Sequence, residues 1–103
     1  MLLTSTEAGK IAIEFIMLEW SIPDEYQDWF SVINSRLLGV SWYVVEVGID
    51  GLPDRWYIQV YDTGDCDPNY TFDSPIPSEE KLSDLQELPE FIAEVLISER
   101  NVR

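Results

Sequence analysis

The apolar positions of the first twenty residues recur at helical spacing and predict an amphipathic helix. Thr4 and Glu7 have the spacing of a capping box, in which each side chain covers a free backbone amide at the start of a helix. The apolar stripe that follows consists of Ala8, Ile11, Ala12, Phe15 and Leu18, and Ile13, Ile16, Met17 and Trp20 widen it. We therefore expect a helix that begins at Thr4 and is buried on more than one side.

Residues 21–39 carry a second apolar pattern of helical type. Ser21 is a candidate helix cap, and Pro23 suits a first helical turn. The apolar members of this segment are Tyr26, Trp29, Phe30, Ile33 and Leu37, and Gly39 stands where a helix ends. The pattern predicts a helix from about Pro23 to Leu37.

Two runs rich in β-branched and aromatic residues, 40–49 and 55–62, predict a β-hairpin around a turn at 50–54. Alternation places Trp56, Ile58 and Val60 on one face of the second strand. Burying both apolar faces together requires opposed residues whose numbers sum to an odd value, such as 47 with 58 and 45 with 60. The other face carries Trp42, Val44, Glu46, Tyr57, Gln59 and Tyr61. Such a mixed face is either partly covered by a helix or used for contact.

The remaining residues predict a short third strand at 69–72 and a helix that begins near Ser78. Pro89 opens a last helix, whose core-facing residues are Phe91, Ile92, Val95 and Leu96.

Together these elements predict a single α+β domain that spans residues 1–103. It has an N-terminal helix or helix pair, a two- to three-stranded antiparallel meander, and C-terminal helices packed on one face. Hydrophobic residues make up 46% of the chain, which suffices for one core. We expect Phe15, Val45, Trp56 and Ile58 near the centre of that core.

Charge narrows the classes of partner. The chain has 20 acidic and 6 basic residues, a formal net charge of −14. Such a surface repels nucleic acid and anionic membranes, and it is compatible with a basic protein, with cations or with no partner. Self-repulsion favours a monomer or a weak homodimer.

The chain has no histidine, which excludes histidine-based catalysis and histidine-ligated metals. Cys66 is the single cysteine, so no intrachain disulfide forms, and a cytoplasmic location is expected. No signal-peptide pattern is present at the N-terminus. We expect a protein that is not an enzyme and carries no cofactor.

The loop 62–69 concentrates acids in a way that resembles the start of a calcium-binding loop. Asp65, Asp67 and Asn69 alternate as calcium ligands do. Tyr70 and Ile76 stand where a calcium loop needs glycine and a bidentate glutamate, so the pattern is incomplete. Acids on both sides of Cys66 raise the expected pKa of its thiol, which favours an ordinary loop cysteine.

Residues 8–20 and 40–64 resemble small bacterial toxin-immunity-type α+β domains, which have an N-terminal helix followed by a meander with a Trp at the head of its second strand. The matching residues are the helix and the hairpin sequences Trp-Tyr-Val-Val-Glu-Val and Asp-Arg-Trp-Tyr-Ile-Gln-Val-Tyr-Asp-Thr-Gly. The resemblance implies a non-enzymatic inhibitor that binds a toxin through an acidic surface.

The sequence therefore favours a non-catalytic interaction protein that binds a basic protein partner. The candidate binding residues are Glu46, Tyr57, Tyr61, Asp62, Asp65 and Asp67. One alternative is a small cation- or ligand-binding domain that uses the loop from Asp62 to Asn69. The other is an enzyme that works with carboxylates alone.

Overall fold

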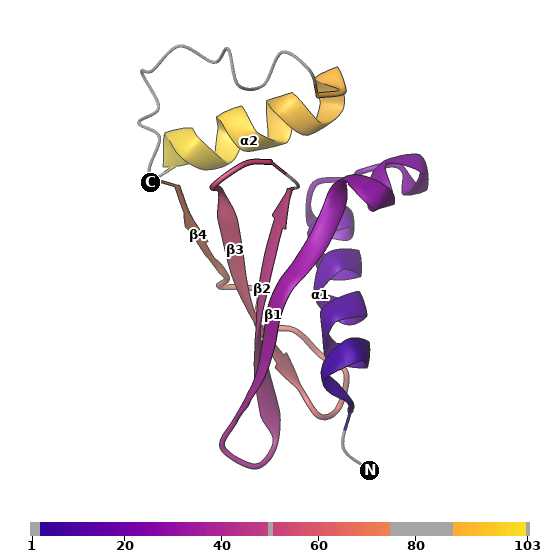
Figure 1. The fold of residues 1–103 in the computed structure, drawn as a ribbon, viewed down its shortest axis with the longest axis vertical. Coiled ribbons are helices and arrows are strands. Elements are labelled where there is room, and N and C mark those ends of the chain that lie inside the picture. The colour runs from indigo at the N-terminus through magenta and orange to yellow at the C-terminus, as the bar shows by residue number, and fades with distance from the viewer. Residues whose placement is uncertain (1–2, 50, 75–87, 103) are drawn as a thin grey trace.

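Four antiparallel strands form one sheet in the order β1-β2-β3-β4, with one helix beside the sheet and another across its end (Figure 1). The computed structural model describes residues 3–49, 51–74 and 88–102. The elements are α1 Ser5–Glu19, the 3₁₀-helix η1 Asp24–Trp29, β1 Phe30–Leu38, β2 Trp42–Ile49, β3 Arg55–Tyr61, β4 Thr71–Asp73 and α2 Glu90–Val102. The α+β class is confirmed, and the sheet has four strands where two or three were expected.

Helix α1 begins as predicted. The Thr4 hydroxyl accepts a hydrogen bond from the Glu7 amide, and the Glu7 carboxylate accepts one from the Thr4 amide. The bond from the Thr4 amide to the carboxylate, with the Thr4 side chain as the second cause, lowers the pKa of Glu7 below its ordinary value. The helix buries Ala8, Gly9, Ala12, Ile13, Ile16 and Met17. Leu18 was expected on this buried face. That prediction is wrong, because the Leu18 side chain is 81% exposed.

The end of α1 explains Ser21, which was read as the cap of a following helix. Ser21 has φ +52°, and its amide donates to the Leu18 carbonyl. The Ile22 amide donates to the Met17 carbonyl at 2.7 Å, and both of these side chains are buried. This pair of bonds is a Schellman motif, with serine in the left-handed position that glycine usually takes.

The helix predicted from Pro23 to Leu37 is wrong. Its first part is the 3₁₀-helix η1, and the rest is strand β1. Residues 31–35 are Ser-Val-Ile-Asn-Ser, which are all mediocre helix formers and include two β-branched residues. Pairing with β2 satisfies the backbone of β1 along one edge, and Gly39, with φ +69°, lies in the turn between the two strands. The apolar residues between Tyr26 and Leu37 have helical spacing only because a 3₁₀-helix is followed directly by a strand, and the two elements together give that spacing by chance.

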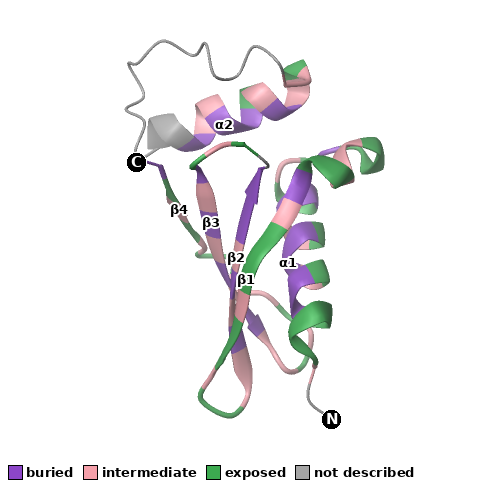
Figure 2. Ribbon diagram, in the orientation of Figure 1, coloured by how far each residue is buried: buried purple, intermediate pink, exposed green. Residues whose placement is uncertain are grey.

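The predicted hairpin is present, and its paired residues sum to an odd number, as burial of both apolar faces required. Val45 pairs with Ile58 and Val47 with Trp56, so the example pairs 47 with 58 and 45 with 60 were two residues out of register. The inner face of the sheet buries Tyr43, Val45, Val47, Trp56, Ile58 and Val60 (Figure 2).

Trp56 stands at the centre of the core, as expected, together with Val45 and Ile58. Its ring lies 5.7 Å from that of Phe30 and 5.2 Å from that of Phe72, each in a tilted or edge-on arrangement. The prediction that Phe15 lies at the centre of the core is wrong. Phe15 is only partly buried, and it packs edge-on against Tyr70 at the margin of the core.

The third predicted strand is β4, two residues later than its expected start, and the last helix is α2. Ile92, Val95 and Leu96 are buried and Phe91 is partly buried, which confirms the predicted face of α2. The expected packing of C-terminal helices on one face of the sheet needs correction. Helix α2 lies across the end of the sheet, whereas α1 runs along it (Figure 1). The helix predicted near Ser78 lies outside the described residues.

Candidate interaction surface

The face of the sheet that points away from the core carries paired aromatic and polar side chains. We call this set the outer face: Trp42, Val44, Glu46, Tyr57, Gln59 and Tyr61. Trp42 lies opposite Tyr61, and Glu46 lies opposite Tyr57. All members are of intermediate exposure, while the buried residues of α1 and α2 belong to the core on the inner face. The two tyrosines predicted as contact residues therefore reach solvent on a surface that the described helices leave open.

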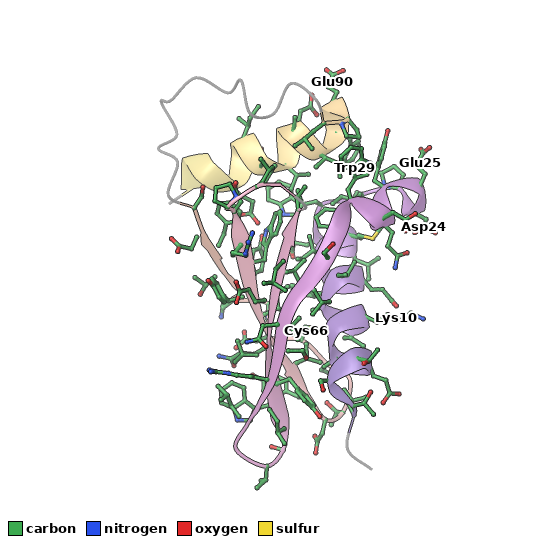
Figure 3. All side chains as sticks on the ribbon, in the orientation of Figure 1. Lys10, Asp24, Glu25, Trp29, Cys66 and Glu90 are labelled. Atoms are coloured by element: carbon green, nitrogen blue, oxygen red, sulfur yellow. The ribbon has the colours of Figure 1, made fainter. Side chains whose placement is uncertain are left out.

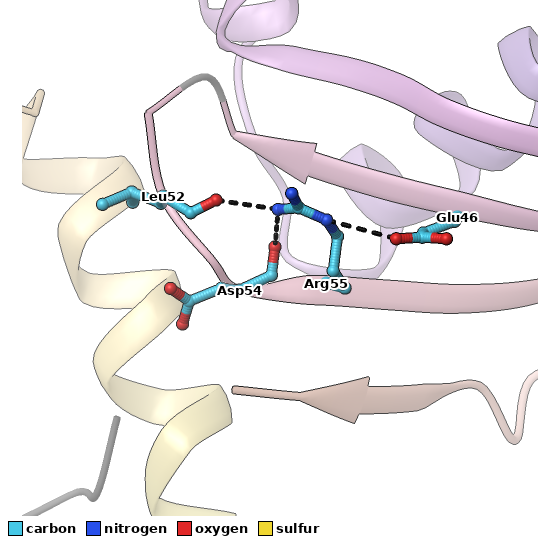
Figure 4. A network of polar contacts seen from close by, with 4 residues as sticks. All are labelled: Glu46, Leu52, Asp54 and Arg55. Carbon is cyan, nitrogen blue, oxygen red and sulfur yellow. Dashed lines mark hydrogen bonds and ion pairs between the residues drawn. The ribbon is translucent and has the colours of Figure 1, made fainter. Parts of the chain in front are cut away.

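One ion pair lies at the end of the outer face that is opposite to Trp42 and Tyr61 (Figure 4). Arg55 Nε lies 3.2 Å from Glu46 Oε2, and the same guanidinium donates to the Leu52 and Asp54 carbonyls at 2.8 Å. Gly48 leaves room for this arginine, because a Cβ there would lie 2.7 Å from its guanidinium nitrogen. Arg55 offsets the charge of Glu46, which makes Glu46 a weaker attraction for a basic partner than the sequence suggested.

The acidic loop returns to the outer face at the Tyr61 end. The Asp67 amide donates a hydrogen bond to the Gln59 carbonyl, and the backbone of Cys66 forms an isolated antiparallel β-bridge with that of Val60. The loop therefore runs beside β3. The Tyr61 hydroxyl lies 3.4 Å from Asp67 Oδ2. Desolvation, with the nearby Asp67 carboxylate second, raises the pKa of Tyr61 above its ordinary value and keeps the phenol neutral. The structure therefore places Asp67 beside Tyr61.

The other two predicted acids flank this contact. Asp62 follows Tyr61 directly, and its amide donates to the Ser41 carbonyl in the turn region before β2. Asp65 is exposed, and its carboxylate accepts a hydrogen bond from the Thr63 hydroxyl at 3.1 Å. The acidic loop thus lies at the Trp42–Tyr61 end of the outer face, while Glu46 and Tyr57 lie further along the sheet.

The geometry of the loop is that of a turn. Asp67 Oδ1 accepts a hydrogen bond from the Asn69 amide at 2.9 Å, the local Asx bond typical of aspartate in turns. Among the described residues, which include the whole loop 62–69, no group of three or more His, Cys, Asp or Glu side chains gathers as metal ligands do. This arrangement gives the cation-binding alternative no support.

Cys66 is half-buried, and desolvation, with Asp65 as the second cause, raises the pKa of its thiol to about 11. The sequence predicted the direction of this shift from the acids alone, and burial is the larger cause. A thiol of this kind is a poor nucleophile near neutral pH.

Sequence reasoning missed Glu99, which is 5% exposed on α2. Its Oε2 accepts hydrogen bonds from Trp56 Nε1 at 2.6 Å, from the Tyr70 hydroxyl at 2.7 Å and from Trp20 Nε1 at 3.3 Å. The carboxylate thus joins α2 to the end of α1, to β3 and to the segment before β4. A signal existed, since Glu99 continues the buried spacing of Ile92, Val95 and Leu96 along one helix face. The donors around it are neutral, and none of these residues belongs to the outer face.

A hollow of about 480 Å³ lies beside the C-terminal half of α1, on the side where Lys10 and Asp24 project (Figure 3). Its wall combines apolar side chains with Lys10, Glu14, Asp24 and Gln27, and no residue of the outer face lines it. The hollow therefore has no part in the predicted contact surface.

Comparison with known proteins assigns no relative. A scan of protein-family models finds no match, and searches of the curated proteins and of the solved structures find none either. Among the described residues, no helix has both the length and the apolar character needed to cross a bilayer.

Proposed function

We propose that this chain is a non-catalytic binding protein that docks a basic protein partner on its outer face. The observation that carries the proposal is a group of partly exposed rings on the open side of the sheet, those of Trp42, Tyr57 and Tyr61. Asp67 lies 3.4 Å from the Tyr61 hydroxyl. Aromatic side chains contribute most to protein contacts, and opposite charge speeds the encounter. The net charge of −14 selects a basic partner.

The residues divide into two roles. Tyr57 and Tyr61 supply lasting contact area, because their rings lose little conformational entropy on binding. Asp62, Asp65 and Asp67 attract a cationic surface to the Tyr61 end of the sheet. Glu46 takes part only if the partner offers a cation that replaces Arg55.

An inhibitor of the toxin-immunity type is one form of this function. It accords with the resemblance of residues 8–20 and 40–64 to such domains, and with the acids Asp62, Asp65 and Asp67 at the Tyr61 end of the outer face. A cytoplasmic location accords with the single thiol.

The experiment captures partners of the whole chain from the lysate of its host at low salt and elutes them with a salt gradient. The dissociation constant of a basic protein recovered this way is then measured for single variants. Tyr57→Ala and Tyr61→Ala should each weaken binding about 10-fold, which corresponds to about 1.4 kcal/mol. Trp29→Ala is the matched aromatic control, since Trp29 is exposed at the end of η1, outside the outer face.

A second pair of variants tests the charge. Asp67→Asn should slow association more than Glu14→Gln does, because Glu14 is an exposed acid of α1 that has no place on the outer face. Equal effects of the tyrosine variants and Trp29→Ala would overturn the assignment of the outer face.

A further inference from the structure

Strand β1 is an edge of the sheet, and within the described part of the chain it pairs only with β2. It runs over nine residues, which is longer than most strands. A long edge strand presents a row of free backbone donors and acceptors, and soluble proteins usually protect it with charges, proline or bulges. In β1 this protection consists of Arg36 and a register shift between Val32 and Asn34.

The edge is also apolar. Among the described residues, the large hydrophobic side chains that stand exposed are Leu18, Trp29, Val32, Ile33, Leu37 and Val40, and all but Leu18 lie in or next to β1. Val32 is 39%, Leu37 45% and Ile33 47% exposed. Single exposed apolar residues are ordinary, but a cluster of them along one free edge indicates a contact surface.

Charge singles out the same segment. Residues 29–41 contain no Asp or Glu, although the chain has 20 of them, and Arg36 is the charged residue of this stretch. A basic protein has no electrostatic reason to select this strand. Two copies of the chain repel one another over most of their surfaces, and this edge is where the repulsion is weakest.

A hollow of about 370 Å³ borders the edge, lined by Ser5, Thr6 and Gly9 of α1 and by residues 32–35 of β1. Helix α1 approaches β1 closely here, because a Cβ on Gly9 would lie 2.8 Å from the Val32 side chain. A strand added beside β1 would place its inward side chains over this hollow.

We propose that β1 pairs in antiparallel orientation with β1 of a second copy, about a twofold axis, to form one continuous sheet. The second copy is the occupant because it brings an equally apolar, acid-free strand to an edge that carries no acid of its own. The inference goes beyond the proposed function, since the edge of β1 and the outer face are different surfaces. A single strand pair buries little area, so the dimer is weak and forms at high protein concentration.

Sedimentation velocity on the whole chain, from about 10 µM to about 1 mM protein, tests the proposal at about 0.05 M and 0.5 M NaCl. We expect dimer to form with concentration and to be favoured by salt, because salt screens repulsion between two acidic copies. The basic-partner complex has the opposite salt dependence, so a failure of one proposal is distinguishable from a failure of the other.

Ile33→Glu should raise the dissociation constant of the dimer at least 10-fold, whereas the matched control Leu18→Glu should leave it unchanged. If Ile33→Glu does not fold, hydrogen exchange of the wild type decides, because amides of β1 should gain protection as protein concentration rises. A monomer at all concentrations and both salts, equal effects of the two variants, or concentration-independent exchange in β1 would each overturn the proposal.

Discussion

Replacing Glu99 by glutamine preserves the shape of the side chain and removes the charge that three donors share. Trp56 and Tyr70 donate to Glu99 Oε2 at 2.6 and 2.7 Å, and Trp20 donates at 3.3 Å. A hydrogen bond to a charged group contributes about 1.5–3 kcal/mol, against about 0.5–1.5 kcal/mol for a neutral pair. The two short bonds should each lose about 1 kcal/mol, so Glu99→Gln should lower the free energy of unfolding by about 2 kcal/mol.

Urea and thermal unfolding at neutral pH measure this loss. For a domain of this size, about 2 kcal/mol corresponds to a fall in Tm of about 8–16 °C. Glu94→Gln is the control, because Glu94 is exposed on the same helix and its change should stay within about 0.5 kcal/mol. Tyr70→Phe removes one donor, and a double-mutant cycle with Glu99→Gln should give a coupling of about 1 kcal/mol. If Glu99→Gln costs no more than Glu94→Gln, or if the cycle shows no coupling, Glu99 does not hold these segments together as argued.

Four further predictions concern local features. Ser21→Gly should stabilise the fold by about 1 kcal/mol, since glycine adopts the positive φ without strain, and a loss of stability in urea unfolding would contradict this. Thr4→Ala should cost about 1 kcal/mol through the lost cap, and an unchanged Tm would refute that role. With a thiol pKa of about 11, Cys66 should react with iodoacetamide at about pH 8 roughly 100-fold more slowly than a thiol of pKa 9. A rate equal to that of the unfolded chain would contradict the burial of this thiol. Because folding raises this pKa, the protonated thiol contributes its full stabilisation below about pH 9, and this stabilisation is lost as pH rises through about 11. Cys66→Ser should therefore flatten that part of a Tm–pH profile.

Much of the secondary structure follows from short-range signals. Thr4 and Glu7 cap each other three residues apart, and Pro89 stands one residue before α2, so both helix starts are readable along the chain. The sequence also determines which residues of the hairpin face inward, because a shift of the register by one residue would bury Gln59 in place of Ile58. The particular register, Val45 opposite Ile58, depends on the turn, where sequence reasoning was two residues out.

The candidate surface is partly readable in the same way. Alternation alone assigns Tyr57 and Tyr61 to the face opposite Trp56, and the structure agrees. The neutralisation of Glu46 by Arg55 and the return of Asp67 to Tyr61 depend on how the strands and the loop pack, so local pattern does not reveal them.

The sequence by itself determined the start of α1, the inward and outward faces of the central hairpin and the acidic, histidine-free character of the surface. Helix caps and strand alternation depend on residues a few positions apart, and composition does not depend on position at all. None of these signals requires knowledge of the fold. Only the tertiary structure decided that residues 30–38 form an edge strand, because the backbone bonds that stabilise it come from β2. It also decided the role of Glu99, since the donors that surround this carboxylate come from segments 29 to 79 residues away and meet only when the core assembles.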